Sequence, residues 1–430
     1  MERKIQDILL KWKGSLHRKP LILQGARQVG KTYTLLNFGK ANYKNVLYFN
    51  FESSRDLKAI FERDLSPHRI LRELAAISGQ TIFEKGSLIF FDEIQASERA
   101  LTSLKYFAEE APAYHIVAAG SLLSVSINRE QSSFPVGKVE VITLYPLDFE
   151  EFLWALGQKA SVSIIRESFT KNEASTLHNT FLDYYKKYLC IGGMPQVVRE
   201  YAELNDYNFV VSLQKSINDS YIADMAKYAM PMDTVRIMAA FNSIPAQLAK
   251  ENRKFQYRII KTGARANVYE TSLEWLKATC IVIICTKLKE GKFPLAAYSE
   301  PASFKVFMTD TGLLCSKYGI NPMAIMSEVS GFNDIKEILA ENFVATALLT
   351  NGYKSFYWES QGKAEVDFVI QNSEGDIIPI EVKSSENVRS KSLQQFVSKY
   401  NPAYSIRIST KNFGFENNIK SIPLYAVFCI

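Results

Sequence analysis

Two groups of residues in this sequence have the types and spacings that phosphate chemistry needs. The first is the segment GARQVGKT, which follows the apolar run Leu21–Leu23 and matches the pattern G-x-x-x-x-G-K-T. In such a loop, successive backbone N–H groups face a phosphate, and the next helix adds the positive end of its dipole. Lys31 is placed to reach the β- and γ-phosphates and Thr32 to bind Mg²⁺, roles that an ordinary glycine-containing turn would not need. The pattern predicts a loop for MgATP or MgGTP, bound by Gly25, Gln28, Val29, Gly30, Lys31 and Thr32.

Two acids follow an apolar run further along the chain. Four apolar residues, Leu88–Phe91, are typical of a central parallel strand that is covered on both faces. Asp92 then lies at the carboxyl end of the strand, where ligands of open α/β sheets bind, and we expect it to hold Mg²⁺ through water. Glu93 is the candidate to polarise the attacking water. The alternative is a strand that ends in a solvated acidic turn.

A third strand is expected over His115–Ala119, and Ser121 follows it. At that strand end, the Ser121 hydroxyl could hydrogen-bond the γ-phosphate or the attacking water, although a serine is also common where a strand enters a turn. Phosphoryl transfer often uses a further cation from a neighbouring subunit, which would assemble the core as a homo-oligomer. Arg129 and Lys138 are the candidates for that cation.

The second group lies near the carboxyl end and has the pattern D…E-x-K, formed by Asp367, Glu381 and Lys383. Residues i and i+2 of a strand share a face, so Glu381 and Lys383 point the same way, and Asp367 on a neighbouring strand can join them. With Glu341 from a preceding helix, Asp367 and Glu381 could bind one or two Mg²⁺, which would activate a water and clamp a scissile phosphate. Lys383 would orient or deprotonate that water, and its protonation state stays open. The alternative is a strand pair with surface charges.

The composition describes the chain that must position these residues. It has 430 residues, of which 47% are apolar and 22% charged, so we expect a globular protein of two to four domains. Charges interrupt every apolar stretch before it reaches a membrane-spanning length, and the charged amino terminus does not resemble a secretory signal, so a cytoplasmic protein is expected. The five cysteines and four histidines show no metal-binding spacing.

The middle of the chain is expected to be helical to about Met230 and then to form a winged helix-turn-helix. Six basic residues against one acid lie in 250–265, a balance that favours contact with DNA phosphates. The alternative is a winged module that packs on protein. The expected elements are helices over Asp233–Asn242, Ile244–Ala249 and Tyr269–Ala278, and strands over Ile281–Leu288 and Lys305–Thr309.

Several motifs, in this order, resemble a known family. They are GARQVGKT, FFDEIQ, AAGSLL, LYPLDFEEF, IGGMPQVV, YIADMAK and EVDFVI…IPIEVKS. They are similar to motifs of bacterial and archaeal AAA-type ATP-binding proteins whose carboxyl half ends in a PD-(D/E)xK nuclease-like domain. The resemblance favours ATP over GTP and implies the ATPase and nuclease roles for the residues named above. At Lys138 that family commonly has arginine, and lysine lacks the bidentate fork of an arginine finger.

Together these observations predict an α/β protein of four parts: a P-loop ATPase core over 1–145, a helical lid over 146–230, a winged helix over 231–325, and a restriction-endonuclease-like domain over 326–430. We expect an ATP-hydrolysing, DNA-engaging protein with ATP and Mg²⁺ as cofactors and a metal-dependent nuclease-like end. The alternative is a nucleotide-dependent switch whose last domain binds DNA or protein without cleaving.

Overall fold

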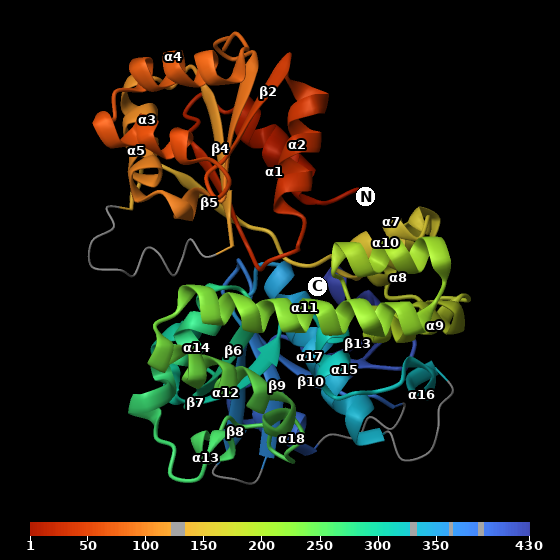
Figure 1. Ribbon diagram of the computed structural model, residues 1–430. Helices are drawn as coiled ribbons and strands as arrows, with labels where there is room; N and C mark the ends of the chain where they lie inside the picture. The colour runs from red at the N-terminus through yellow and green to blue at the C-terminus, as the bar shows by residue number, and fades with distance from the viewer. Residues whose placement is uncertain (122–133, 327–332, 361–363, 386–390) are drawn as a thin grey trace. The chain divides into compact units, whose positions relative to one another are not determined.

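The computed structural model describes residues 1–121, 134–326, 333–360, 364–385 and 391–430. The chain forms two compact units, and Figure 1 labels their elements. The smaller unit comprises Glu2–Tyr145 with Ala278–Cys280, and the larger comprises Pro146–Lys277 and Ile281–Ile430 with Met1. Within the described part of the chain, no helix has the length and apolar character needed to cross a membrane.

The smaller unit is built on a five-stranded sheet in the order β2-β3-β4-β1-β5, in which every neighbouring pair is parallel. The predicted central strands are confirmed, because every residue of β3 and β4 is buried. The strands are β1 Leu21–Gln24, β2 Asn45–Asn50, β3 Ser87–Asp92, β4 His115–Gly120 and β5 Glu140–Thr143.

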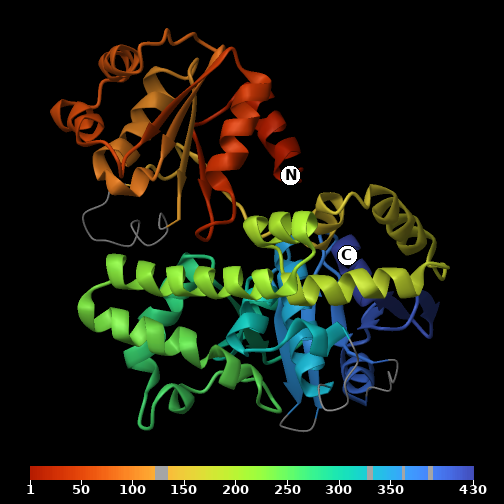
Figure 2. The same ribbon diagram turned by 45° about the vertical axis from the view of Figure 1, so that its right-hand side comes forward.

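Helices cover this parallel sheet on both sides, as its two apolar faces require (Figures 1 and 2). On one side, α3, α4 and α5 bury Phe61, Leu74 and Leu104 in a common core with Phe91 of β3. On the other side lie α1 and α2, and α2 begins at the end of the predicted phosphate loop. The bounds are α1 Ile5–Gly14, α2 Lys31–Asn42, α3 Arg55–Arg63, α4 Pro67–Ser78, η1 Ile94–Ala96 and α5 Glu98–Glu110.

The larger unit begins with the helical segment that the sequence predicts over 146–230. Its helices are α7 Phe149–Ala155, α8 Lys159–Lys171, α9 His178–Ile191, α10 Pro195–Leu204 and α11 Tyr207–Tyr228. The next segment differs from the prediction, because the two expected helices form one helix, α12, over Pro231–Leu248. Pro245 lies inside it, but Phe241, Ile244 and Leu248 are buried at helical spacing, and their burial offsets the hydrogen bond that proline cannot make. The remaining helices are α13 Tyr257–Ile260, α14 Ala266–Ala278, α15 Thr311–Lys317, α16 Pro322–Met326, α17 Asn333–Thr350 and α18 Lys391–Tyr400.

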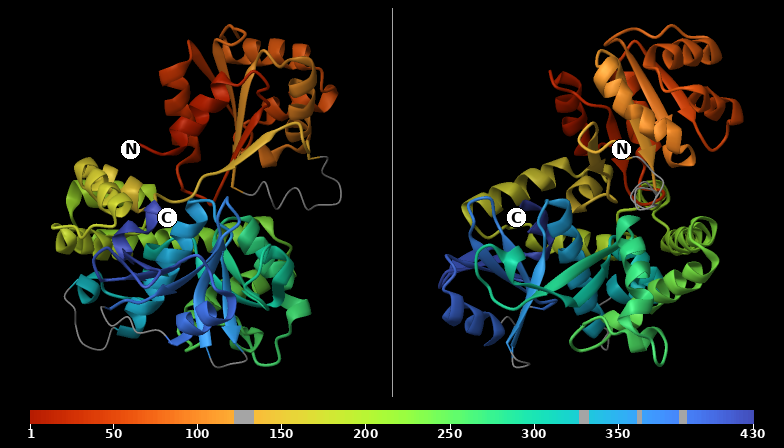
Figure 3. Two further views of the ribbon diagram at one scale, coloured as in Figure 1. Left: turned by 180° about the vertical axis from the view of Figure 1, so that it is seen from behind. Right: turned by 90° about the vertical axis from the view of Figure 1, so that its left-hand side faces the viewer.

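A mixed eight-stranded sheet, in the order β12-β13-β11-β10-β9-β8-β6-β7, forms the rest of this unit (Figure 3). The hairpin predicted as a wing is present as β6 and β7, but it is not a separate wing, because β6 also pairs in parallel with β8. Alternating apolar residues can predict that two neighbouring segments form a hairpin. They do not predict that β8, which is distant in the sequence, pairs with it. The strands are β6 Val282–Leu288, β7 Ser299–Met308, β8 Phe356–Ser360, β9 Ala364–Gln371, β10 Ile377–Val382, β11 Ser405–Ser409, β12 Gly414–Glu416 and β13 Ile419–Pro423.

Candidate functional sites

The predicted phosphate loop joins β1 to α2 and has the backbone that its glycines are needed for. Gly25 has a φ of 150°, and a Cβ added there would lie 2.1 Å from the carbonyl oxygen of Leu144. Gly30 has a φ of 91° and caps the first turn of α2, while Gln28 between them is also left-handed. Glycine is therefore required at both fixed positions, since a side chain would strain or block the loop.

Lys31 is buried at the start of α2, and its side chain turns back over the loop. Its Nζ donates to the carbonyl oxygens of Gly25 at 2.9 Å and Ala26 at 2.8 Å. Burial lowers the pKa of Lys31 to about 8, against the opposing effect of the Glu93 carboxylate. A buried ammonium held by carbonyl oxygens is a group that an anion would stabilise further.

Thr32 and Asp92, the two predicted Mg²⁺ ligands, lie side by side although they come from different elements. The Thr32 hydroxyl donates to Oδ2 of Asp92 at 2.9 Å, and the Tyr48 hydroxyl donates to the same oxygen at 2.8 Å. Asp92 is buried. A hydroxyl and a carboxylate are oxygen donors of the kind that Mg²⁺ prefers, so this pair fits a Mg²⁺ ion that a nucleotide would bring.

Glu93 follows Asp92 in a left-handed conformation with a φ of 50°. Its carboxylate accepts a hydrogen bond of 2.5 Å from Gln95, and burial raises the pKa of this carboxylate from its usual value. Ser121 comes directly after β4, the strand between β3 and β1. It therefore lies at the carboxyl ends of the strands, as Asp92 and the loop do.

The structure describes one of the two candidate cations for a neighbouring active site. Lys138 is half-exposed and pairs with Glu109 of α5 at 2.8 Å. Arg129 lies outside the described residues. Its role, like the finger role of Lys138, stays a prediction.

One supporting residue of the loop has no sequence signal. Arg3 is buried, and its guanidinium donates to the carbonyl oxygen of Val29 at 3.2 Å and to that of Tyr145 at 2.7 Å. Through Arg3, the amino-terminal segment therefore links the phosphate loop at Val29 to Tyr145, the last residue of the smaller unit's main segment. A single basic residue near a chain end matches no motif, so pattern analysis misses it.

The second predicted site is buried and therefore not a row of surface charges. We call Glu341, Asp367, Glu381 and Lys383 the carboxylate cluster; its three acids come from α17, β9 and β10 and are each at most 8% exposed. Asp367 accepts the backbone N–H of Val382 at 2.8 Å, and Lys383 lies 3.3 Å from Glu381. Burial lowers the pKa of Lys383, but the nearby carboxylates outweigh it and raise that pKa above its usual value. Lys383 is therefore a cation here.

Two cations that the sequence does not assign to this site lie beside Glu341. Arg253, in the segment before α13, binds Oε1 of Glu341, and Lys305 of β7 lies 3.8 Å from Oε2. Among the described residues, no three histidine, cysteine or acidic side chains are grouped to hold a metal ion. In this arrangement the cluster does not fit the predicted three-carboxylate metal centre, because protein cations neutralise Glu341 in place of a metal.

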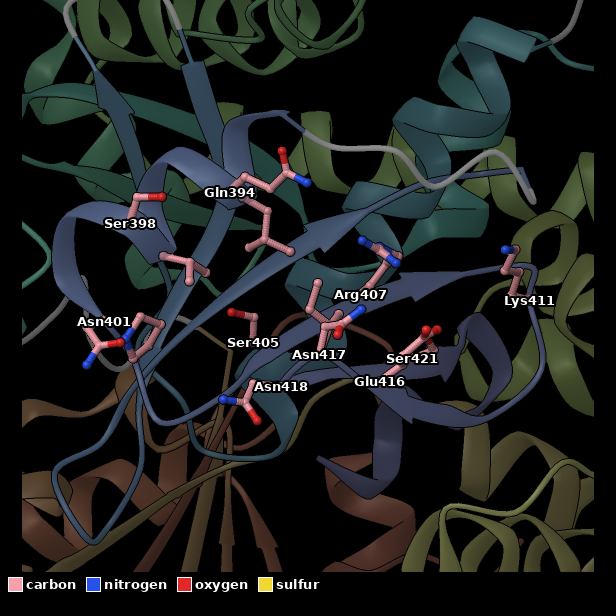
Figure 4. Close-up of a pocket in the computed structure, with 14 residues that line it drawn as sticks. Gln394, Ser398, Asn401, Ser405, Arg407, Lys411, Glu416, Asn417, Asn418 and Ser421 are labelled. Carbon is pink, nitrogen blue, oxygen red and sulfur yellow. The ribbon is translucent and has the colours of Figure 1, made fainter.

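A separate cavity lies between α18, β11 and the β12–β13 hairpin (Figure 4). Its volume is about 610 Å³, and its lining is mostly polar, with Arg407 and Lys411 as its cations. No sequence motif points to this cavity, because its lining comes from four elements with ordinary surface composition.

Comparison with known proteins divides the chain in three. Residues 17–153 match the sequence model of a family described as an AAA domain. Residues 182–324 and 336–427 match two further families, each described as a domain of unknown function. No curated protein matches the chain.

Solved structures resemble the chain at low sequence identity. The Walker-type ATPase PABY2304 of Pyrococcus abyssi is 16% identical, with a TM-score of 0.45 over 74% of this chain and 95% of that one. The Aeropyrum pernix ORC1 protein, solved in complex with DNA, is 12% identical, with a TM-score of 0.31 over 75% and 92%. The Thermotoga maritima RuvB Holliday junction branch migration motor is 15% identical, with a TM-score of 0.30 over 65% and 88%. The family match over residues 17–153, with the parallel sheet and the loop at its edge, shows that the chain contains an AAA-type P-loop domain.

Proposed function

We propose that this protein binds and hydrolyses ATP at the loop of its smaller unit. The observation that carries the proposal is the contact between Thr32 and Asp92 beside Lys31, since these three side chains supply a cation and two Mg²⁺-binding oxygens at one place. When bound, Mg²⁺ would neutralise charge on the β- and γ-phosphates.

Three residues of the chain bind the phosphates and activate the attacking water. Lys31 exchanges the carbonyl oxygens of Gly25 and Ala26 for phosphate oxygens. Glu93 accepts a proton from the attacking water, and its raised pKa makes it a better base than an exposed glutamate. Ser121 donates its hydroxyl to the γ-phosphate from the neighbouring strand end.

ATP binding by a lysine variant tests this proposal. Lys31→Ala should lower the affinity for MgATP at least tenfold in calorimetry, because a buried charge-assisted contact is lost. Lys40→Ala, which removes an exposed lysine at the other end of α2, is the matched control and should bind as the wild type does. Equal binding by both variants would refute the site.

We further propose that the larger unit engages DNA through the basic segment 250–265. Support comes from Arg258, Lys261 and Arg265, which are exposed and therefore accessible to phosphates. Two other basic residues of the segment are already used, since Arg253 pairs with Glu341 and Lys254 with Glu359. Replacing the three exposed residues by alanine should weaken duplex binding and flatten its salt dependence.

Phosphodiester hydrolysis at the carboxylate cluster is the second candidate function. It is favoured by the gathering of the buried Asp367 and Glu381 with the partly exposed Lys383. The protein cations on Glu341 favour the alternative, a nucleotide-dependent switch whose carboxyl-terminal part binds DNA or protein without cleaving.

Incubation with circular and linear DNA in Mg²⁺ or Mn²⁺, with and without ATP, decides between these two. Metal-dependent cutting that Lys383→Ala loses while ATP turnover persists would establish a nuclease. Intact ATP hydrolysis without cutting under any condition would refute the nuclease and favour the switch.

A further inference from the structure

A cavity in the larger unit lies apart from the two sites described above, between α18, β11 and the β12–β13 hairpin (Figure 4). Of the described residues that line it, none belongs to the phosphate loop or to the carboxylate cluster. Its volume of about 610 Å³ falls within the range of roughly 300 to 1,000 Å³ that is typical of small-molecule sites. The cavity is therefore large enough for a small molecule that neither site accounts for.

Arg407 contributes a guanidinium to the lining of this cavity. It lies in β11, the strand between β10 and β13. Among the described residues, its buried Nε has no hydrogen-bond partner, and no carboxylate forms an ion pair with the guanidinium. Glu381, its register neighbour on β10, pairs with Lys383 at 3.3 Å. Because a guanidinium stays charged and a buried N–H needs an acceptor, Arg407 favours an anion in the cavity.

A second cation makes the lining basic. Lys411, in the segment between β11 and β12, is exposed and belongs to no ion pair of the described residues. Glu416, at the end of β12, is the one acid among the described lining residues. Two cations and one carboxylate leave one excess positive charge. Figure 4 shows Arg407 and Lys411 toward one end of the lining and Asn401 toward the other, so the positive charge is concentrated at one end.

Neutral side chains that can donate and accept hydrogen bonds make up much of the remaining lining. Asn417 and Asn418 form the turn between β12 and β13, with φ of 51° and 57°, and asparagine adopts such left-handed backbone at low cost. Ser421 of β13 pairs in register with Arg407, so its hydroxyl lies on the same face of the sheet as the guanidinium. Val397 of α18 adds an apolar wall. Amides and hydroxyls of this kind suit the hydroxyl groups of a sugar.

We propose that this cavity binds a small phosphate ester of a sugar, either a sugar phosphate or a mononucleotide. The phosphate pairs with Arg407, whose planar guanidinium matches two phosphate oxygens, and with Lys411. The amide and hydroxyl side chains bind the sugar. This site is additional to the nucleotide loop, and it depends neither on ATP hydrolysis nor on cleavage at the carboxylate cluster.

Calorimetry with ribose 5-phosphate tests this site. The parent is the full chain with Lys31→Ala, which removes the cation of the nucleotide loop, so that the loop does not contribute to the signal. We expect the parent to bind ribose 5-phosphate, and Arg407→Ala to lower that affinity roughly tenfold or more, because a charge-assisted contact is lost. Ribose without phosphate should bind as weakly as ribose 5-phosphate binds to the Arg407 variant. Arg236→Ala is the matched control, because this arginine of α12 pairs with Asp233 outside the cavity and should leave the affinity unchanged.

Two further variants change the charge of the lining in opposite directions. Lys411→Ala should weaken the binding of ribose 5-phosphate and Glu416→Gln should strengthen it, each about two- to fivefold, as expected for exposed charges. If Arg407→Ala does not fold, these two variants carry the test, because both positions are exposed. Equal affinity in all variants, or no binding of ribose 5-phosphate to the folded parent at millimolar concentration, would overturn the site.

AMP, measured beside ribose 5-phosphate in the same parent, distinguishes the two sources of the phosphate. Tighter binding of AMP would support the site with a mononucleotide as its ligand, and equal binding would support it with a sugar phosphate. A duplex DNA with a 5′-phosphate is the remaining probe. If this duplex binds in a way that Arg407→Ala abolishes while neither small ester binds, the small-molecule site is wrong and the cavity contacts nucleic acid instead.

Discussion

The hydroxyl of Thr32 donates a hydrogen bond of 2.9 Å to Asp92, which joins the first turn of α2 to the end of β3. This contact brings the two predicted Mg²⁺ ligands together at one place. Strand β4 lies between β3, which ends at Asp92, and β1, which leads into the loop before Thr32, so the contact passes over the carboxyl end of β4. The site therefore depends on the order of the strands as much as on the phosphate loop itself.

Replacing either partner of this contact should weaken nucleotide binding only when Mg²⁺ is present. For Thr32→Val or Asp92→Asn, we expect the affinity for MgATP to fall about 10- to 100-fold, a range typical of residues that hold a metal through a ligand or a water. Affinity for ATP in EDTA should change little, and calorimetry in both buffers measures the difference. An equal loss in both buffers would show that the residues support the loop rather than the metal.

Gly25→Ala should disrupt the phosphate loop. The new methyl group would lie against the carbonyl oxygen of Leu144, and neither backbone can move without shifting β1 or β5. We expect MgATP affinity to fall roughly tenfold or more, with lower thermal stability of the smaller unit. Gly14→Ala is the control, because a Cβ at Gly14 meets open space and the change should stay within about 0.5 kcal/mol. Similar behaviour of both variants would contradict the loop geometry.

The sequence marks the loop before α2 and the buried strand before Asp92 because each of these features is local. The whole loop is one continuous segment, and the apolar run before Asp92 marks a buried strand without knowledge of its neighbours. The contact of Arg253 with Glu341 joins residues 88 positions apart and belongs to no repeating pattern. Lys305 lies in a strand that was expected to form a wing, and only the pairing of β6 with β8 brings it beside Glu365.

Arg3→Ala should destabilise the smaller unit by about 1 to 3 kcal/mol, because the carbonyl oxygens of Val29 and Tyr145 lose a charged donor. Chemical denaturation followed by fluorescence measures this loss, and MgATP affinity should fall with it. Arg72→Ala, at an exposed position of α4, is the matched control and should change stability by less than about 0.5 kcal/mol. If the Arg3 variant is as stable as this control, the amino-terminal segment does not stabilise the phosphate loop.

The stability of the smaller unit should fall in mild acid because of His115. Burial, with the charges of Arg18 and Lys13, lowers the pKa of His115 to about 4, and its Nδ1 lies 2.7 Å from the Tyr43 hydroxyl. The unfolded chain takes up the proton near pH 6.5, so this contribution to stability is complete above pH 6.5 and is lost as the pH falls toward 4. We expect a loss of about 1 to 2 kcal/mol, allowing for partial solvent screening.

Urea unfolding at pH 7 and at pH 4.5 measures this loss. His115→Gln should reduce the difference between the two pH values, since glutamine does not titrate. His17→Gln, which replaces an exposed histidine, should keep the full difference. If His115→Gln retains the wild-type pH dependence, another group is responsible.

Steady-state ATP turnover in Mg²⁺, measured for the wild type and for Glu93→Gln, tests whether the loop of the smaller unit is a hydrolytic site. We predict that the wild type hydrolyses ATP, while Glu93→Gln binds MgATP with similar affinity and loses turnover by about 100-fold or more, because the base is removed and the loop is intact. Binding without turnover in the wild type, or turnover in Glu93→Gln equal to that of the wild type, would contradict this prediction.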